Sequence, residues 1–152
     1  MRRAAALAFL ALAASLAGCN RGPEAGLAVE DAWVRLPAVA GRPGAGYFTL
    51  RGGPAADRMA AIDSPSAARA ELHQGGKMDG MMTMRPINGV DLPSGGRVAF
   101  APEGDHVMLF GIDPAIKPGG TMRLQFRFRS GETRQADARV VAAGDPAPSF
   151  AP

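Results

Sequence analysis

Four side chains with soft or borderline donor atoms occur in the central part of this 152-residue chain. They are His73, Met84, His106 and Met108. His106 and Met108 are two positions apart, so both project from one face if that segment is a β-strand. His73 and Met84 flank a predicted hairpin turn, and the arms of a hairpin run about 5 Å apart. Imidazole and thioether donors together favour Cu(I) over Zn²⁺, Mg²⁺ or Ca²⁺.

The cysteine and methionine content excludes several other kinds of site. Eight methionines accompany a single cysteine, Cys19. An internal disulfide, a cysteine-based zinc site and a CxxC redox pair are therefore ruled out. A blue-copper electron-transfer site also needs a cysteine thiolate, so a copper carrier is the better interpretation. Because the chain has only two histidines and no glycine-rich phosphate loop, we expect a protein that is not an enzyme.

The N-terminal segment has the features of a secretory signal peptide. Two arginines precede an apolar run from Ala4 to Ala17, which is too short for a membrane-spanning helix. The sequence Leu16-Ala17-Gly18-Cys19 resembles the lipobox of bacterial lipoproteins, in which the cysteine is acylated. We therefore expect a signal peptide at 1–18, lipidation at Cys19 and a membrane anchor in the bacterial periplasm, with the inner or outer membrane left open. The alternative is an ordinary signal peptide with an incidental cysteine.

Charge gives little information on partners once the signal peptide is removed. The whole chain has a formal charge of +3, and loss of the two arginines of the signal leaves +1. No basic run of the nucleic-acid-binding type follows, and we expect no nucleic acid partner. Apolar residues make up 47% and charged residues 20% of the chain, which favours one packed domain.

Short segments with strand character alternate with Gly- and Pro-rich turns through the rest of the chain. The strongest is 121–129, where every second residue is apolar, as in a half-buried strand. The other expected strands are 29–35, 46–51, 59–62, 68–73, 81–85, 97–101, 106–112 and 132–141. No segment has a helical period over three turns, so the expected fold class is all-β, an antiparallel β-sandwich or barrel. We expect a tether at 19–27, the domain at 28–142 and a flexible tail at 143–152.

The spacing of the four donor residues is H-x10-M-x21-H-x-M, which resembles the pattern of the periplasmic copper chaperones called PCu(A)C. The flanking sequences are similar to the same family: Ala32-Trp33-Val34-Arg35, Gly46-Tyr47-Phe48, Glu71-Leu72-His73, Met82-Thr83-Met84-Arg85-Pro86 and His106-Val107-Met108-Leu109. The similarity runs from about Val29 to Val141, which is most of the mature chain, and implies a cupredoxin-like β-sandwich. It also implies that His73, Met84, His106 and Met108 bind one Cu(I) per chain.

The same resemblance implies a recipient for the copper. PCu(A)C proteins pass copper toward the binuclear CuA centre of cytochrome c oxidase subunit II. This subunit, or another periplasmic copper protein, is therefore the expected partner. Some relatives carry a His- and Met-rich C-terminal extension for a second copper ion. Residues 145–152 contain neither residue type, which agrees with a single ion per chain.

Some features of the sequence leave alternatives open. Met78, Met81 and Met82 lie outside the four-residue pattern and are either a soft-donor rim or part of ordinary loop packing. Trp33 and Tyr47 are assigned to the core.

Two alternative functions also stay open. A copper-buffering or resistance lipoprotein would carry the same ligands. An interaction lipoprotein, whose methionine loop docks a partner, would bind no metal.

Overall fold

The computed structural model describes residues 26–150. The predicted signal peptide at 1–18, the predicted lipidation site Cys19 and most of the predicted tether lie outside the described residues, as do residues 151–152. No helix in the described part of the chain has the length and apolar character needed to cross a membrane.

The described residues form ten β-strands. The strands are β1 (Ala28–Arg35), β2 (Gly44–Arg51), β3 (Asp57–Asp63), β4 (Ala67–Met78), β5 (Met81–Pro86), β6 (Val90–Leu92), β7 (Arg97–Phe100), β8 (His106–Ile112), β9 (Thr121–Phe128) and β10 (Thr133–Val141). The predicted all-β class is therefore confirmed. Strand β6 was not predicted, because three residues are too few to display an alternating pattern.

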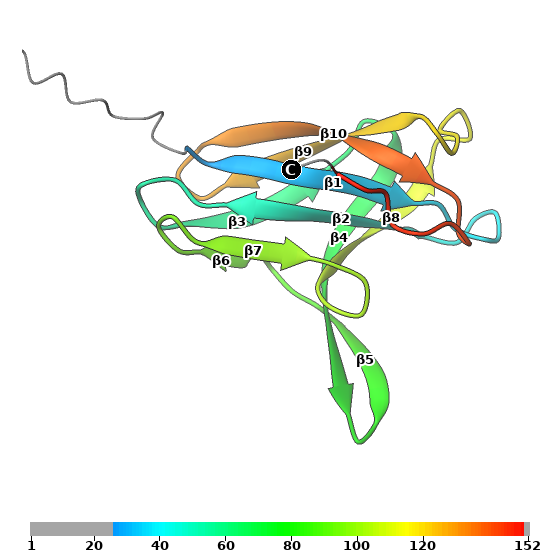
Figure 1. The fold of residues 1–152 in the computed structure, drawn as a ribbon, viewed down its shortest axis with the longest axis horizontal. Coiled ribbons are helices and arrows are strands. Elements are labelled where there is room, and N and C mark those ends of the chain that lie inside the picture. Colours follow the sequence, from blue (N-terminus) through cyan, green and yellow to red (C-terminus); the bar gives the residue numbers. More distant parts are fainter. Residues whose placement is uncertain (1–25, 151–152) are drawn as a thin grey trace, which may run out of the picture.

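Neighbouring strands form one sheet in the order β5-β4-β8-β2-β1-β10-β9-β3-β6, with β7 paired to the end of β2. In the described sheet, β1 and β10 run parallel, with Trp33 opposite Arg139 (Figure 1). The other pairs along this path are antiparallel. The sheet is thus mixed, whereas the sequence led us to expect an antiparallel one. Alternation of apolar residues specifies which face of a strand is buried and carries no information on the direction of its neighbour.

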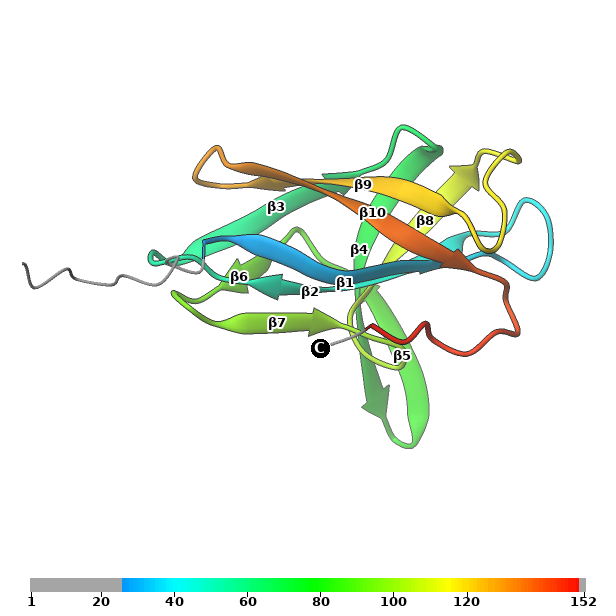
Figure 2. The ribbon, with the colours of Figure 1, turned by 45° about the horizontal axis from the view of Figure 1, so that its top comes forward.

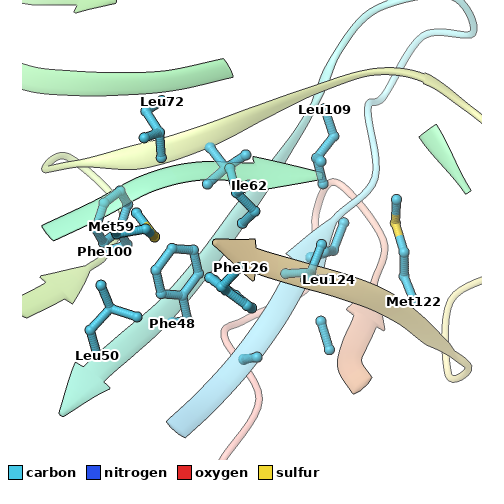
Figure 3. Close-up of a cluster of buried hydrophobic side chains, with 14 of the residues drawn as sticks. Phe48, Leu50, Met59, Ile62, Leu72, Phe100, Leu109, Met122, Leu124 and Phe126 are labelled. Atoms are coloured by element: carbon cyan, nitrogen blue, oxygen red, sulfur yellow. The ribbon is translucent and has the colours of Figure 1, made fainter. Parts of the chain in front are cut away.

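The sheet curls around one hydrophobic core (Figure 3). Met122, Leu124 and Phe126 of β9 are buried at alternate positions, as the sequence predicts. Phe126 meets Phe48 of β2 edge-on, with ring centroids 4.8 Å apart. Because β2 and β9 are not neighbours in the sheet, this contact requires the sheet to fold over on itself. Burial of each such side chain contributes roughly 1.5–3 kcal/mol to the free energy of folding. The core therefore stabilises the sheet whose outer face carries the other side chains.

Strands β4 and β5 form a hairpin that projects beyond the body of the sheet (Figures 1 and 2). Its arms are paired as far as Met78, which lies opposite Met81. Asp79 and Gly80 form the two-residue turn, with φ angles of 51° and 79°, the left-handed conformation typical of an Asp-Gly type I′ turn. Residues 74–80 were expected to form a loop. The structure instead continues β4 to Met78, so the methionines lie on paired strands.

Residues 143–150 come after β10 and have no regular secondary structure. They turn back at the end of β10 and run beside the sheet (Figure 2). Arg35 donates a hydrogen bond to the carbonyl oxygen of Asp145 at 3.0 Å, and Arg139 donates one to that of Ser149 at 2.8 Å. The Arg139 guanidinium also lies 4.7 Å from the ring centroid of Phe150. The segment contacts the sheet at these points, and its flexibility stays a prediction.

Candidate metal centre

Strands β4 and β8 lie side by side and bring the two histidines together. Their register places His73 directly opposite His106. It also pairs Glu71 with Met108. The ring centroids of the two histidines are 5.9 Å apart, with an angle of 25° between the ring planes. Alternate residues such as Leu72 belong to the core, so the histidines and Met108 lie on the outer face of the sheet.

Met84 reaches the same face from β5. It lies opposite Gly75, which is two residues beyond His73 and therefore shares its face of β4. Met84, His106 and Met108 line one cavity of about 350 Å³. His73 does not line this cavity and lies next to it, against His106. The structure thus brings three of the four predicted ligands into one cavity and the fourth to its edge.

Hydrogen bonds leave one nitrogen of each imidazole ring free. His106 Nδ1 is 2.9 Å from the carbonyl oxygen of Gly104. Because a carbonyl only accepts, Nδ1 carries the proton, and Nε2 of the neutral ring keeps its lone pair. His73 Nε2 is 3.2 Å from the Glu71 carboxylate, so by the same reasoning its Nδ1 keeps the lone pair. This Nδ1 is buried and has no hydrogen-bond partner among the described residues, a deficit that a bound metal ion would satisfy.

Glu71, the partner of His73, is itself held in place. Arg69 Nε contacts one of its carboxylate oxygens at 2.9 Å, and the Arg69 guanidinium lies 4.2 Å over the ring of Phe110. An outer partner of this kind fixes the tautomer and the orientation of a metal-binding histidine. From the sequence, Glu71 was noted only as part of the segment Glu71-Leu72-His73 and was given no role. The available signal was its position two residues before His73, on the same face of a strand.

The proposed donors differ in their access to solvent. The His73 side chain is 13% exposed and His106 is 9% exposed, whereas Met84 is 63% exposed. The site is therefore closed on its imidazole side and open on its hairpin side. Among residues 26–150, no group of three or more His, Cys, Asp or Glu side chains is placed to hold a metal ion. The donors that do meet are imidazole and thioether, the combination that favours Cu(I).

The loop between β7 and β8 packs against the hairpin at Gly75. A Cβ atom at this position would lie 2.4 Å from the carbonyl oxygen of Gly104, a contact that only glycine permits. The same Gly104 oxygen accepts the hydrogen bond from His106. Gly75 therefore connects the hairpin that carries Met84 to the orientation of the His106 ring. Neither glycine was identified from the sequence as part of the site.

Tyr47 of β2 also lines the cavity. Its ring packs against Trp33, with centroids 4.3 Å apart. Both side chains are buried, as expected of core residues. The pair lies outside the main core cluster, on the sheet face that carries Met108. Burial raises the pKa of the Tyr47 hydroxyl, so the ring gives the cavity an uncharged wall.

Comparison with known proteins relates the chain to lipoproteins. A protein-family model described as "Putative lipoprotein LpqE-like" matches residues 27–140. A relative described as "Putative lipoprotein Lxx21020", from Leifsonia xyli subsp. xyli (strain CTCB07), is 28% identical over 109 residues. The match covers 71% of this chain and 65% of the relative, so the chain spans slightly less than two thirds of the relative's length.

Solved structures share the fold. The apo PCuAC domain of PmoF2 superposes with a TM-score of 0.65 at 22% identity, over 78% of this chain and 92% of that domain. The solution structure of CuI-DR1885 from Deinococcus radiodurans gives a TM-score of 0.57 at 26% identity, over 81% of this chain and 85% of that protein. The described strands therefore have the arrangement found in PCuAC domains.

Proposed function

The chain belongs to the LpqE-like lipoprotein family and has the fold of PCuAC domains, and from this premise we propose that it is a periplasmic Cu(I) carrier rather than an enzyme. The family resemblance predicted from the spacing of the donor residues is confirmed by these relatives. The proposed ligands are His73, Met84, His106 and Met108, with one Cu(I) per chain.

The arrangement of donors on the outer face of β4, β5 and β8 is the observation that supports this function. Two imidazoles with centroids 5.9 Å apart each keep one nitrogen free of hydrogen bonds. Thioethers from β5 and β8 line the adjacent cavity. Residues that are distant in the sequence thus lie close together on the outer face of the sheet, away from the core. Their side chains carry the donor atoms that Cu(I) prefers.

We propose that copper leaves by stepwise ligand exchange with a recipient that offers softer donors. Met84 is more exposed than either histidine, so it is the ligand that a recipient displaces first. Cysteine thiolates of a CuA centre are softer than imidazole and thioether, which makes transfer to the empty CuA site of cytochrome c oxidase subunit II downhill. Acylation at Cys19 would keep the carrier at the membrane surface.

Transfer to a purified CuA domain tests the proposed delivery. Cu(I)-loaded carrier is mixed with the reduced, copper-free soluble domain of subunit II, the proteins are separated, and copper is measured in each. We expect most of the copper to move to the CuA domain. Complete retention by the carrier would contradict the proposed recipient.

Deletion of the gene in the source bacterium separates delivery from storage. Loss of a delivery protein should lower cytochrome c oxidase activity when copper is scarce. Sensitivity that occurs only at high copper would instead support a buffering or resistance function. Native mass spectrometry with and without Cu(I) addresses the remaining alternative, because an interaction lipoprotein would show no mass increase of one copper ion.

A further inference from the structure

We propose that Met82 is an additional Cu(I) ligand that holds the ion while it passes between the four-residue site and a recipient. This role rests on the proposed function and goes beyond the four ligands named there. It also distinguishes Met82 from Met78 and Met81, although all three lie outside the four-residue pattern. Met82 belongs to the face of the hairpin that carries the site, whereas Met78 and Met81 belong to the opposite face.

The register of the hairpin separates these residues. Met82 and Met84 are two positions apart on β5, so both project from one face. Met81 is one position out of phase with them and projects from the other face, where it is paired with Met78. Because the turn has only two residues, this alternation continues without interruption to the tip of the hairpin.

The cavity of the candidate site includes the Met82 side chain. Met82 lines it together with Met84, His106 and Met108, and the other two hairpin methionines do not. Alternate residues of a strand are about 6–7 Å apart, so Met82 lies one step nearer the tip than Met84. A methionine side chain has three rotatable bonds, which allow its sulfur to approach an ion bound at Met84.

Met82 would act during the stepwise exchange of ligands that releases the copper ion. A departing copper ion loses its protein donors one at a time, and each vacated position is filled by water or by the nearest donor. A thioether binds in its neutral form, so one Cu–S bond to Met82 forms as one bond to a site residue breaks, with no proton released. Copper remains Cu(I) throughout, and no oxidant or reductant is required. Met82 thereby keeps the coordination soft until a donor from the recipient replaces it.

Packing alone does not explain why position 82 has a methionine and not an aliphatic residue. Met82 lies opposite Lys77 and is 49% exposed, so about half of its surface is open to solvent. An exposed thioether is open to oxidation. Leucine would provide similar apolar contact without a donor atom, which makes the sulfur the feature to test.

Met82→Leu and Met81→Leu are a matched pair of variants. Each replaces an exposed methionine of β5 by a residue of similar volume, one on the site face and one on the opposite face. Wild-type and variant chains are loaded with one equivalent of Cu(I), and transfer to excess bicinchoninate is followed by stopped-flow absorbance. The equilibrium affinity is measured by competition with the same chelator. We expect Met82→Leu to bind copper and to release it about tenfold more slowly, and Met81→Leu to match the wild type.

The possible outcomes distinguish this role from the proposed function. A wild-type rate in Met82→Leu would overturn the role of Met82 and leave copper binding intact, since loading is measured on the same samples. Equal slowing in both variants would also overturn it, because the effect would belong to the hairpin surface in general. Failure of the wild-type chain to bind Cu(I) would overturn both.

Discussion

Replacement of Gly75 by alanine is expected to weaken copper binding without altering any proposed ligand. The added Cβ would lie 2.4 Å from the carbonyl oxygen of Gly104, and that oxygen accepts the hydrogen bond from His106 Nδ1 at 2.9 Å. Carbon–oxygen contacts are normally about 3.3–3.6 Å, so the hairpin and the loop must separate by about 1 Å. Both colliding groups are attached to backbone, so no side-chain rotation can absorb the shift.

A displacement of this size affects both stability and affinity. Overpacking costs about 1–3 kcal/mol, which should lower the free energy of unfolding of the copper-free protein. Metal–ligand distances are held within about 0.2 Å, so a displaced His106 and a displaced Met84 cannot both keep good geometry around one ion. Loss of an outer partner of a metal ligand typically lowers affinity about 10- to 100-fold, and we expect Gly75→Ala to fall in that range.

Gly76→Ala is the matched control for this variant. A Cβ at Gly76 would meet only the hydroxyl oxygen of Thr83, at 3.5 Å, which is an ordinary contact. Cu(I) affinity is measured by competition with bicinchoninate, and stability by urea unfolding of the copper-free proteins. We expect Gly76→Ala to bind copper as the wild type does. Equal affinity of Gly75→Ala and the wild type would refute the coupling between the hairpin and the His106 ring.

Three further predictions concern the site and its scaffold. Glu71→Gln removes the charge that pairs with Arg69 and the carboxylate that orients the His73 ring, so Cu(I) affinity should fall about tenfold. Unchanged affinity would exclude a positioning role for Glu71. Affinity should also weaken on acidification, because protons compete with Cu(I) for the ligand nitrogens, and a flat profile would argue against imidazole ligands. Away from the site, the guanidinium groups of Arg51 and Arg97 hold the pKa of Glu30 below its usual value. This carboxylate therefore stabilises the fold above the ordinary glutamate range, and its contribution is lost as the pH falls. The Tm difference between the wild type and Glu30→Gln should accordingly shrink on acidification from about pH 7 to pH 3, and a constant difference would count against the ion pair.

Local patterns predicted most of the strands, because a period of two is visible directly in the sequence. Strand β9 is the clearest example, with its alternating buried residues. The order of the strands is not a local property. The parallel pairing of β1 with β10 and the contact between Phe48 and Phe126 depend on residues far apart in the chain. Neither could be derived from the alternation within any one strand.

The residue types and spacing indicated a set of four donor residues, which stays a prediction, whereas the surroundings of these residues emerged only from the structure. Gly104 contributes a backbone oxygen, which no residue type signals in a sequence. Gly75 is explained by the approach of a loop that lies almost thirty positions further along the chain. The turn at Asp79 and Gly80 is different, because an Asp-Gly pair between strands predicts a two-residue turn. That turn type fixes the register and would have placed Met82 on the site face.

The central claim is that imidazole nitrogens and thioether sulfurs of four residues hold one Cu(I). A competition titration with bicinchoninate, run on the wild type and on a double variant with His106→Ala and Met108→Ala, tests it most directly. We expect the wild type to bind one equivalent of Cu(I) and the double variant to lose at least about a hundredfold in affinity, more than the loss of an outer partner causes. An unchanged affinity in the double variant would contradict the claim and place the copper elsewhere on the chain.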